Sequence, residues 1–407
     1  MSTRKQKWLA FLLVPPALIA VFVVGLFVFM SATARPLHPD AKAVSAVTQW
    51  SPPARWTSAV DQARQLARAG IVESNLPGLS VAVGAAGELV WAEGFGWADL
   101  EKKTPVSPGT RFRTGGVSIA LTSAAVGLLL EKERLHLDAE IQTPVSAFPE
   151  KQWPMTLRQV MGHTAGVRPD GGDEEPLFRE RCERTADGLK RVADRDLLFE
   201  PGTRYRYSTY GWILVSAAVE SAANEPFFSF MRAQIFKPLG MADTTPDSAT
   251  EPIPDRATFY YPRFAGDPRY GPDEAPEGNY ACFAGAGAFL STPSDLVRFG
   301  LAIGSGKLLK PETVKTLQAA QRLASGADTG YGLGWDLETA SVAGENTRQV
   351  GHDGEYFIGG STSFITLPDR AIVVAVTTNI SFADTASLAL KIAQVFAEQG
   401  KAAGAIR

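Results

Sequence analysis

The chain has 407 residues, with 45% hydrophobic and 20% charged content, which is the composition of an ordinary globular protein. Its formal net charge of −3 argues against binding to nucleic acid or to an anionic membrane surface by bulk electrostatics. The four histidines (His38, His136, His163 and His352) form no His-x-x-x-His pair, so we expect no metal and no other cofactor.

The N-terminal segment has the pattern of a membrane anchor. Residues 8–30 form 23 consecutive positions without a charge, and three basic residues precede them. At about 1.5 Å per residue such a helix spans roughly 34 Å, enough to cross a hydrocarbon core of about 30 Å. We therefore predict that residues 1–34 contain a single-pass anchor, with the domain on the periplasmic or extracellular side because the basic flank stays cytoplasmic. Cleavage near Ala34, which would release a secreted protein, is the alternative.

The rest of the chain reads as one domain behind a linker. Residues 35–55 are rich in proline and form the linker, residues 56–400 form the domain, and residues 401–407 form a tail. The middle of the domain, roughly residues 112–325, is mainly helical and loop-rich, whereas strand-like runs lie near both of its ends. This order predicts an α+β fold in which both ends of the domain build one antiparallel sheet and the middle forms a helical second lobe.

Individual elements follow from hydrophobic periodicity and turn residues. Apolar positions at helical spacing predict helices, and alternating or β-branched runs predict strands. In chain order we expect a helix from residue 56 to 71, a β-hairpin over residues 79–92 with its turn at Ala85-Ala86-Gly87, a helix over 211–223, strands over 331–335, 361–367 and 371–378, and a helix over 385–399.

Two features of the middle region do not by themselves indicate a functional site. Cys182 and Cys282 are far apart and show no Cys-x-x-Cys spacing, so a disulfide in an oxidising compartment and two buried free thiols both stay open. The arginines between residues 179 and 206 are interleaved with acidic residues, which predicts a solvated lid loop rather than an anion-binding site.

Residues 111–122 form the segment in which we look for catalytic residues. Its polar, glycine-containing start, Arg111 to Gly116, leads into an apolar run that ends at the charged residues 131–134. This pattern is typical of an exposed turn that feeds a buried helix, with first-turn residues at the mouth of a cleft. Residues 111–122 resemble the phrase Phe-Arg-x-Gly followed by Ser-x-x-Lys in the penicillin-binding-protein-like serine hydrolases, which include class C β-lactamases, D-alanyl-D-alanine carboxypeptidases and related esterases.

Further phrases carry the same resemblance over roughly residues 56–400. They are Thr156 to Val167, Tyr207-Ser208-Thr209 after Phe199-Glu200-Pro201-Gly202, His352-Asp353-Gly354, and Leu367-Pro368-Asp369-Arg370. The resemblance implies a β-lactamase/transpeptidase-like fold. It also implies a cleft in which a Ser-x-x-Lys helix start, a Tyr-x-Asn motif and a Lys-Thr-Gly or His-x-Gly strand meet.

The resemblance implies a site that has lost its reacting pair. The serine position falls on Gly116 and the lysine position on Ile119. Ser118 is a neighbouring candidate nucleophile, but its +3 residue is Leu121, and the chain has no lysine between Lys103 and Lys132.

The other two motifs are partly kept. Tyr207 and His352 are the candidate catalytic residues, and Gly116, Ile119, Thr209 and Gly354 are candidate ligand contacts, with Thr209 in place of the family asparagine. Loss of the nucleophile in a covalent catalytic unit typically costs about 10⁶-fold in turnover.

These residues predict a membrane-anchored, exported pseudoenzyme that keeps its cleft for a peptide or a small cell-wall-derived molecule. Two alternatives stay open: an active hydrolase that uses Tyr207 or Ser118, and an envelope scaffold for which the cleft is irrelevant. Replacing Gly116 by serine and Ile119 by lysine would then be expected to restore some acylation. The oligomeric state does not follow from the sequence.

Overall fold

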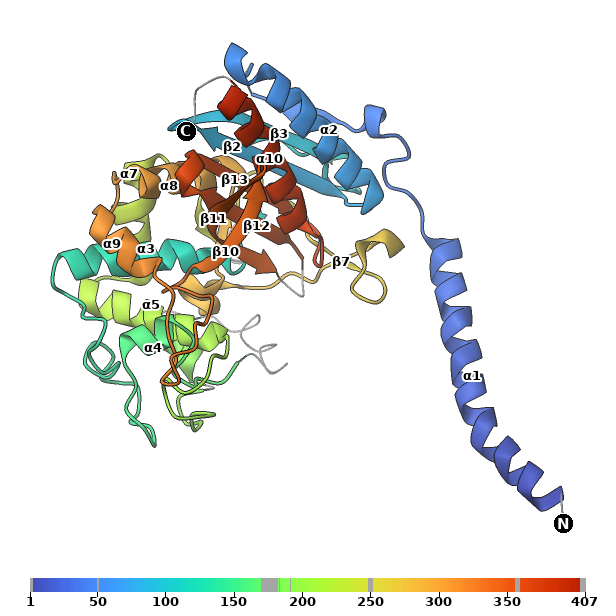
Figure 1. The fold of residues 1–407 in the computed structure, drawn as a ribbon, viewed down its shortest axis with the longest axis horizontal. Helices are drawn as coiled ribbons and strands as arrows, with labels where there is room; N and C mark the ends of the chain where they lie inside the picture. Colours follow the sequence, from blue (N-terminus) through green and yellow to red (C-terminus); the bar gives the residue numbers. More distant parts are fainter. Residues whose placement is uncertain are drawn as a thin grey trace.

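The computed structural model describes residues 3–49, 51–169, 182, 184–190, 192–247, 252–355 and 359–402, and side chains from residue 18 onward within these ranges. The predicted lid loop therefore lies partly outside the described residues. Helix α1 (Thr3–Thr33) projects away from the rest of the molecule, and Phe27 contacts Tyr270 edge-on (Figure 1). Where side chains are described, no helix is long and apolar enough to cross a membrane, and residues 8–17 of the predicted span fall outside that part.

One antiparallel sheet forms the framework of the domain. Its strand order is β1-β3-β2-β13-β12-β11-β10, with β4 paired to β3 at one end. The strands are β1 (Ala46–Thr48), β2 (Gly78–Ala85), β3 (Glu88–Asp99), β4 (Thr104–Pro105), β10 (Asp336–Val342), β11 (Glu345–Glu355), β12 (Ser361–Leu367) and β13 (Ile372–Thr378). The sheet thus joins the two ends of the domain, which confirms the predicted α+β architecture.

The centre of the sheet is where the N-terminal and C-terminal halves of the domain meet. Strand β2 pairs with β13, with Val81 opposite Val376 and Val83 opposite Val374. The predicted hairpin is confirmed, because β2 and β3 are joined at Ala86 and Gly87, both with positive φ, which suits a tight turn. The strands predicted over 361–367 and 371–378 match β12 and β13 within one residue.

Helices cover both faces of this sheet. Helices α2 (Thr57–Glu73) and α10 (Thr385–Ala402) pack together on one face (Figure 1). The rings of Trp56, Trp91 and Phe396 form an aromatic core there. Helix α8 (Pro293–Gly304) lies on the other face against β2 and β13. Burial of these apolar faces is the main stabilising contribution to the fold.

The second lobe is helical and sits below the sheet in Figure 1. Its helices include α3 (Val117–Glu131), α4 (Leu157–Met161), α5 (Thr209–Ala223), α6 (Phe227–Met231), α7 (Lys237–Leu239) and α9 (Pro311–Leu317). Cys182 and Cys282 form a disulfide that ties this lobe together across 100 residues of sequence, which resolves the alternative left open by the sequence.

One expectation from periodicity was wrong, and one strand was not predicted. Residues 331–335 are not a strand: Tyr331 forms only an isolated bridge with Asp336, because the run is interrupted by Gly332 and by Gly334 at φ +93°. Conversely, β10 was not predicted, because it is an edge strand in which only Ala340 and Val342 are buried. Strand β11, which carries His352 and Gly354, lies where the resemblance implied a His-x-Gly strand.

Candidate functional site

The start of α3 is held in a tightly bonded turn. Thr114 donates through its backbone N–H and its hydroxyl to the Phe289 carbonyl, at 3.0 and 2.9 Å. Gly115 takes a positive φ of +52°, which favours glycine. The N–H groups of Val117, Ser118 and Ile119 then donate to the carbonyls three residues before them. These three donors are therefore engaged within the turn.

Gly116, at the N-cap of α3, faces β11 directly. A Cβ atom built on Gly116 would lie 2.5 Å from the backbone oxygen of Asp353 and 2.8 Å from Cε1 of His352. These separations are far below van der Waals contact, and the first partner is backbone. Gly354, the other candidate ligand contact, packs on the Thr114 carbonyl in the same way. The position that corresponds to the family nucleophile therefore has no room for a side chain.

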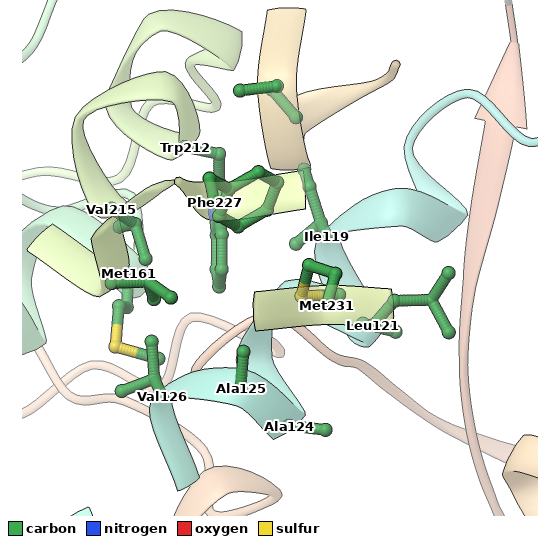
Figure 2. Packing of buried hydrophobic residues seen from close by; sticks show 14 of the residues in the cluster. Ile119, Leu121, Ala124, Ala125, Val126, Met161, Trp212, Val215, Phe227 and Met231 are labelled. Atoms are coloured by element: carbon green, nitrogen blue, oxygen red, sulfur yellow. The ribbon is translucent and has the colours of Figure 1, made fainter. Parts of the chain in front are cut away.

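Ile119, at the lysine position, belongs to the core of the helical lobe. Its side chain is fully buried and packs among Trp212, Phe227 and Met231 (Figure 2). The sequence-based assignment of Ile119 as a ligand contact was wrong, because the first turn of α3 rotates this side chain into the interior.

Ser118 is buried in the same turn. Its side chain has no solvent exposure, and its hydroxyl lies 2.8 Å from the Thr114 hydroxyl, which in turn donates to Phe289. A hydroxyl that completes such a chain satisfies local polar groups. Ser118 is therefore a structural residue, which corrects its interpretation as a candidate nucleophile.

Tyr207 and Thr209 lie at the start of α5. Between them, Ser208 caps the helix: its hydroxyl accepts from the Gly211 N–H at 3.1 Å and donates to the Arg168 carbonyl at 2.7 Å. This cap fixes the backbone on both sides, so that Tyr207 and Thr209 are half-buried at the edge of the lobe. The Tyr207 ring lies 6.2 Å from the His352 ring, so the second and third family motifs do meet.

His352, on β11, has both ring nitrogens engaged by the protein. Nδ1 lies 2.7 Å from the Asp353 carbonyl, which can only accept, so Nδ1 carries the proton in the neutral ring. Nε2, 3.0 Å from the Tyr331 hydroxyl, then accepts from it. Asp336 Oδ2 is 3.9 Å from Nδ1, and only 4% of the His352 side chain is exposed. The ring is thus oriented by internal contacts rather than aimed at solvent.

Tyr207 and His352 belong to a larger group of rings, which we call the tyrosine–histidine cluster: Tyr205, Tyr207, Tyr331, His163 and His352. The His163 ring lies 4.3 Å from Tyr207 and 4.8 Å from Tyr331, and Nδ1 of His163 accepts from the Ser208 N–H at 3.1 Å. Its Nε2 is buried, with no hydrogen-bond partner in the described part of the chain.

Burial shifts the pKa values of three residues of this cluster. Desolvation, with a smaller effect from His352, holds the pKa of His163 well below its usual value, so His163 is neutral at pH 7. Burial raises the pKa of Tyr205 to about 12 and that of Tyr331 well above its usual value. These tyrosines therefore stay protonated and do not supply a phenolate nucleophile near neutral pH.

The sequence did not assign Tyr331 or Asp336 to the site. Tyr331 was placed in a strand, and no motif marked it. His163 bridges its loop to the start of α5, since its backbone carbonyl accepts from Arg206 N and its ring accepts from Ser208 N. A hydrophobic, glycine-rich run such as residues 331–335 carries no signal that its first side chain turns inward.

Comparison with known proteins bears on the whole domain. A family model described as Beta-lactamase matches residues 59–397. Serine beta-lactamase-like protein LACTB, mitochondrial, of Mus musculus is 25% identical, over 90% of this chain and 86% of that protein. Penicillin-binding protein 4* of Bacillus subtilis (strain 168) is 26% identical, over 72% of this chain and 65% of that protein.

A solved structure shows the same fold. D-amino acid amidase from Ochrobactrum anthropi SV3 superposes with a TM-score of 0.69 at 22% identity, over 85% of this chain and 99% of that chain. The family model covers most of the chain, and the sheet with its helical insertion has the expected layout. The chain therefore belongs to the Beta-lactamase family of serine-hydrolase-related proteins.

Proposed function

We propose that this chain is a pseudoenzyme of its family, without acyl transfer through a serine. The observation that carries the proposal is the closed nucleophile position: a side chain at residue 116 would meet the backbone of Asp353 and the ring of His352. At residue 119 an amine is replaced by a buried isoleucine. A covalent mechanism needs a nucleophile and a base within hydrogen-bond reach of each other, and neither group is present at these positions.

The proposed role is recognition of a peptide end or a cell-wall-derived small molecule at the outer side of the tyrosine–histidine cluster. Tyr205 is 38% exposed and Tyr207 half-buried, and partly exposed aromatic rings with hydroxyl groups suit a ligand that has both apolar and polar parts. The relative from Bacillus subtilis is named for binding penicillin, which supports this ligand class by analogy.

A hydrolysis assay beside a titration tests both parts. Full-length protein should not accelerate hydrolysis of a chromogenic cephalosporin or of a p-nitrophenyl ester, and should bind a D-Ala-D-Ala peptide saturably by calorimetry. Tyr207→Phe should weaken binding, whereas Tyr261→Phe, on strand β7 (Tyr260–Pro262), should not. Turnover that is lost in Tyr207→Phe would favour the active hydrolase, and the absence of saturable heat would favour the envelope scaffold.

We further propose that the domain is exported and tethered by its N-terminal segment. Residues 8–30 lack charges, the large apolar side chains described between Leu18 and Phe29 are exposed, and the disulfide suits an oxidising compartment. Alkaline extraction of membranes should leave the full-length chain in the pellet. A soluble product that begins near Ala34 would indicate cleavage instead.

A further inference from the structure

A second cavity lies away from the residues of the family motifs. It has a volume of about 730 Å³ and is enclosed by α8, α9, the end of β11 and the β12–β13 turn; we call it the α8–α9 pocket. This volume lies within the range of about 300–1,000 Å³ that holds small-molecule ligands. None of the residues at the start of α3, in the Tyr207 segment or in the His352 motif lines it.

The walls of the pocket are largely apolar. Leu301 and Ile303 come from α8, Val314 from α9, and Leu367 and Val373 from the two central strands. A Cβ atom built on Gly304, at the end of α8, would meet nothing within 4 Å, so no side chain fills the space at this point of the wall. Binding of an alkyl chain in such a pocket is favourable, because it removes apolar surface from water.

The charge at the mouth has one sign. Lys315 and Arg348 are the charged residues among those that line the pocket, and no acidic residue lines it. Both are exposed, and the Arg348 guanidinium is held in place by donating to the Gln318 carbonyl at 2.9 Å. An arginine and a lysine that line the same pocket favour an anionic group, and arginine can bind carboxylate or phosphate oxygens through two N–H groups.

We propose that the α8–α9 pocket binds a single-chain anionic amphiphile, whose alkyl chain enters the apolar cavity while its carboxylate or phosphate head meets Lys315 and Arg348. This inference is independent of whether the family site is reactive, because the two sites share no residue. Each buried methylene should raise affinity about fourfold until the cavity is filled.

The test is photolabelling of the full-length protein in zwitterionic nanodiscs with a diazirine-bearing dodecanoic acid, followed by peptide mapping. Label should appear within residues 300–319 or 366–373. Octanoate, decanoate and dodecanoate should compete with affinities that rise about fourfold per methylene. Dodecanoate should compete better than dodecanol, and a comparison with dodecyl phosphate identifies the preferred head.

Substitutions test whether the head group and the alkyl chain bind in this pocket. Lys315→Gln with Arg348→Gln should weaken dodecanoate about two- to thirtyfold at low salt, while dodecanol is unchanged. Arg232→Gln with Lys237→Gln, which removes two exposed charges elsewhere, should leave both unchanged. Ala319→Trp, at an exposed position on the rim, should block labelling while the circular dichroism spectrum stays native. Label found only at other peptides, or equal competition in both double variants, would overturn the proposal.

Discussion

The closed nucleophile position predicts a stability effect at a single methyl group. Gly116 has φ −58° and ψ −19°, so the backbone itself accepts any residue. Gly116→Ala would nevertheless place Cβ 2.5 Å from the Asp353 oxygen and 2.8 Å from His352 Cε1. Strand β11 would have to move away from α3, and overpacking of this kind costs about 1–3 kcal/mol. Gly116→Ser should cost at least as much, because its side chain is larger.

Gly304, at the last position of α8, is the matched control. A Cβ atom there meets nothing within 4 Å, so Gly304→Ala should be neutral or stabilise the protein by about 0.4–1 kcal/mol through the unfolded state. Urea denaturation followed by fluorescence compares the midpoints of the three proteins. The closed-site interpretation would be refuted by Gly116→Ala unfolding at the wild-type midpoint, or by an equal loss in Gly304→Ala.

Three further predictions concern the buried groups. Ile119→Ala should lower the free energy of unfolding by about 2–5 kcal/mol in urea denaturation, and a negligible loss would contradict its place in the core. Because burial holds the pKa of His163 below that of the unfolded chain, the unfolded state binds more protons below about pH 6.5. The free energy of unfolding should therefore decrease as the pH is lowered below about 6.5, by up to about 1.4 kcal/mol per pH unit. Denaturation across pH 5–7 should show a smaller slope in His163→Asn and an unchanged slope in His136→Asn, which replaces an exposed histidine. Asp247→Ala, which removes the carboxylate 2.8 Å from buried Arg113, should cost about 3–5 kcal/mol by the same measurement, and a change below 1 kcal/mol would show that this pair is not needed.

The sheet could be predicted in outline because both ends of the domain carry strong local signals. The β2–β3 hairpin has alternating runs around a glycine turn, and β13 is β-branched at every position except Ala375. Strand β10 carries no such signal, since an edge strand with mostly exposed side chains has no need for apolar alternation. Its pairing with β11 is a long-range property that local patterns do not contain.

The candidate site was predicted in part. The family resemblance implied that the motifs of Tyr207 and His352 meet, and the two rings lie 6.2 Å apart. Which way a side chain turns within a motif was not predictable. Ser118 and Ile119 are adjacent in the first turn of α3, and both face inward, while Tyr331 reaches His352 from a segment with no motif. These directions depend on the packing of α3 against β11 and the helical lobe.

The most direct test of the proposed loss of acyl transfer is intact mass spectrometry of the full-length protein after incubation with a fluorescent penicillin and, separately, with a fluorophosphonate. A penicillin-binding protein of known reactivity serves as the positive control. With glycine at residue 116, isoleucine at 119 and Ser118 buried, the mass should remain that of the unmodified chain. A stoichiometric adduct, mapped to any serine or tyrosine at the junction of the lobes, would contradict the account.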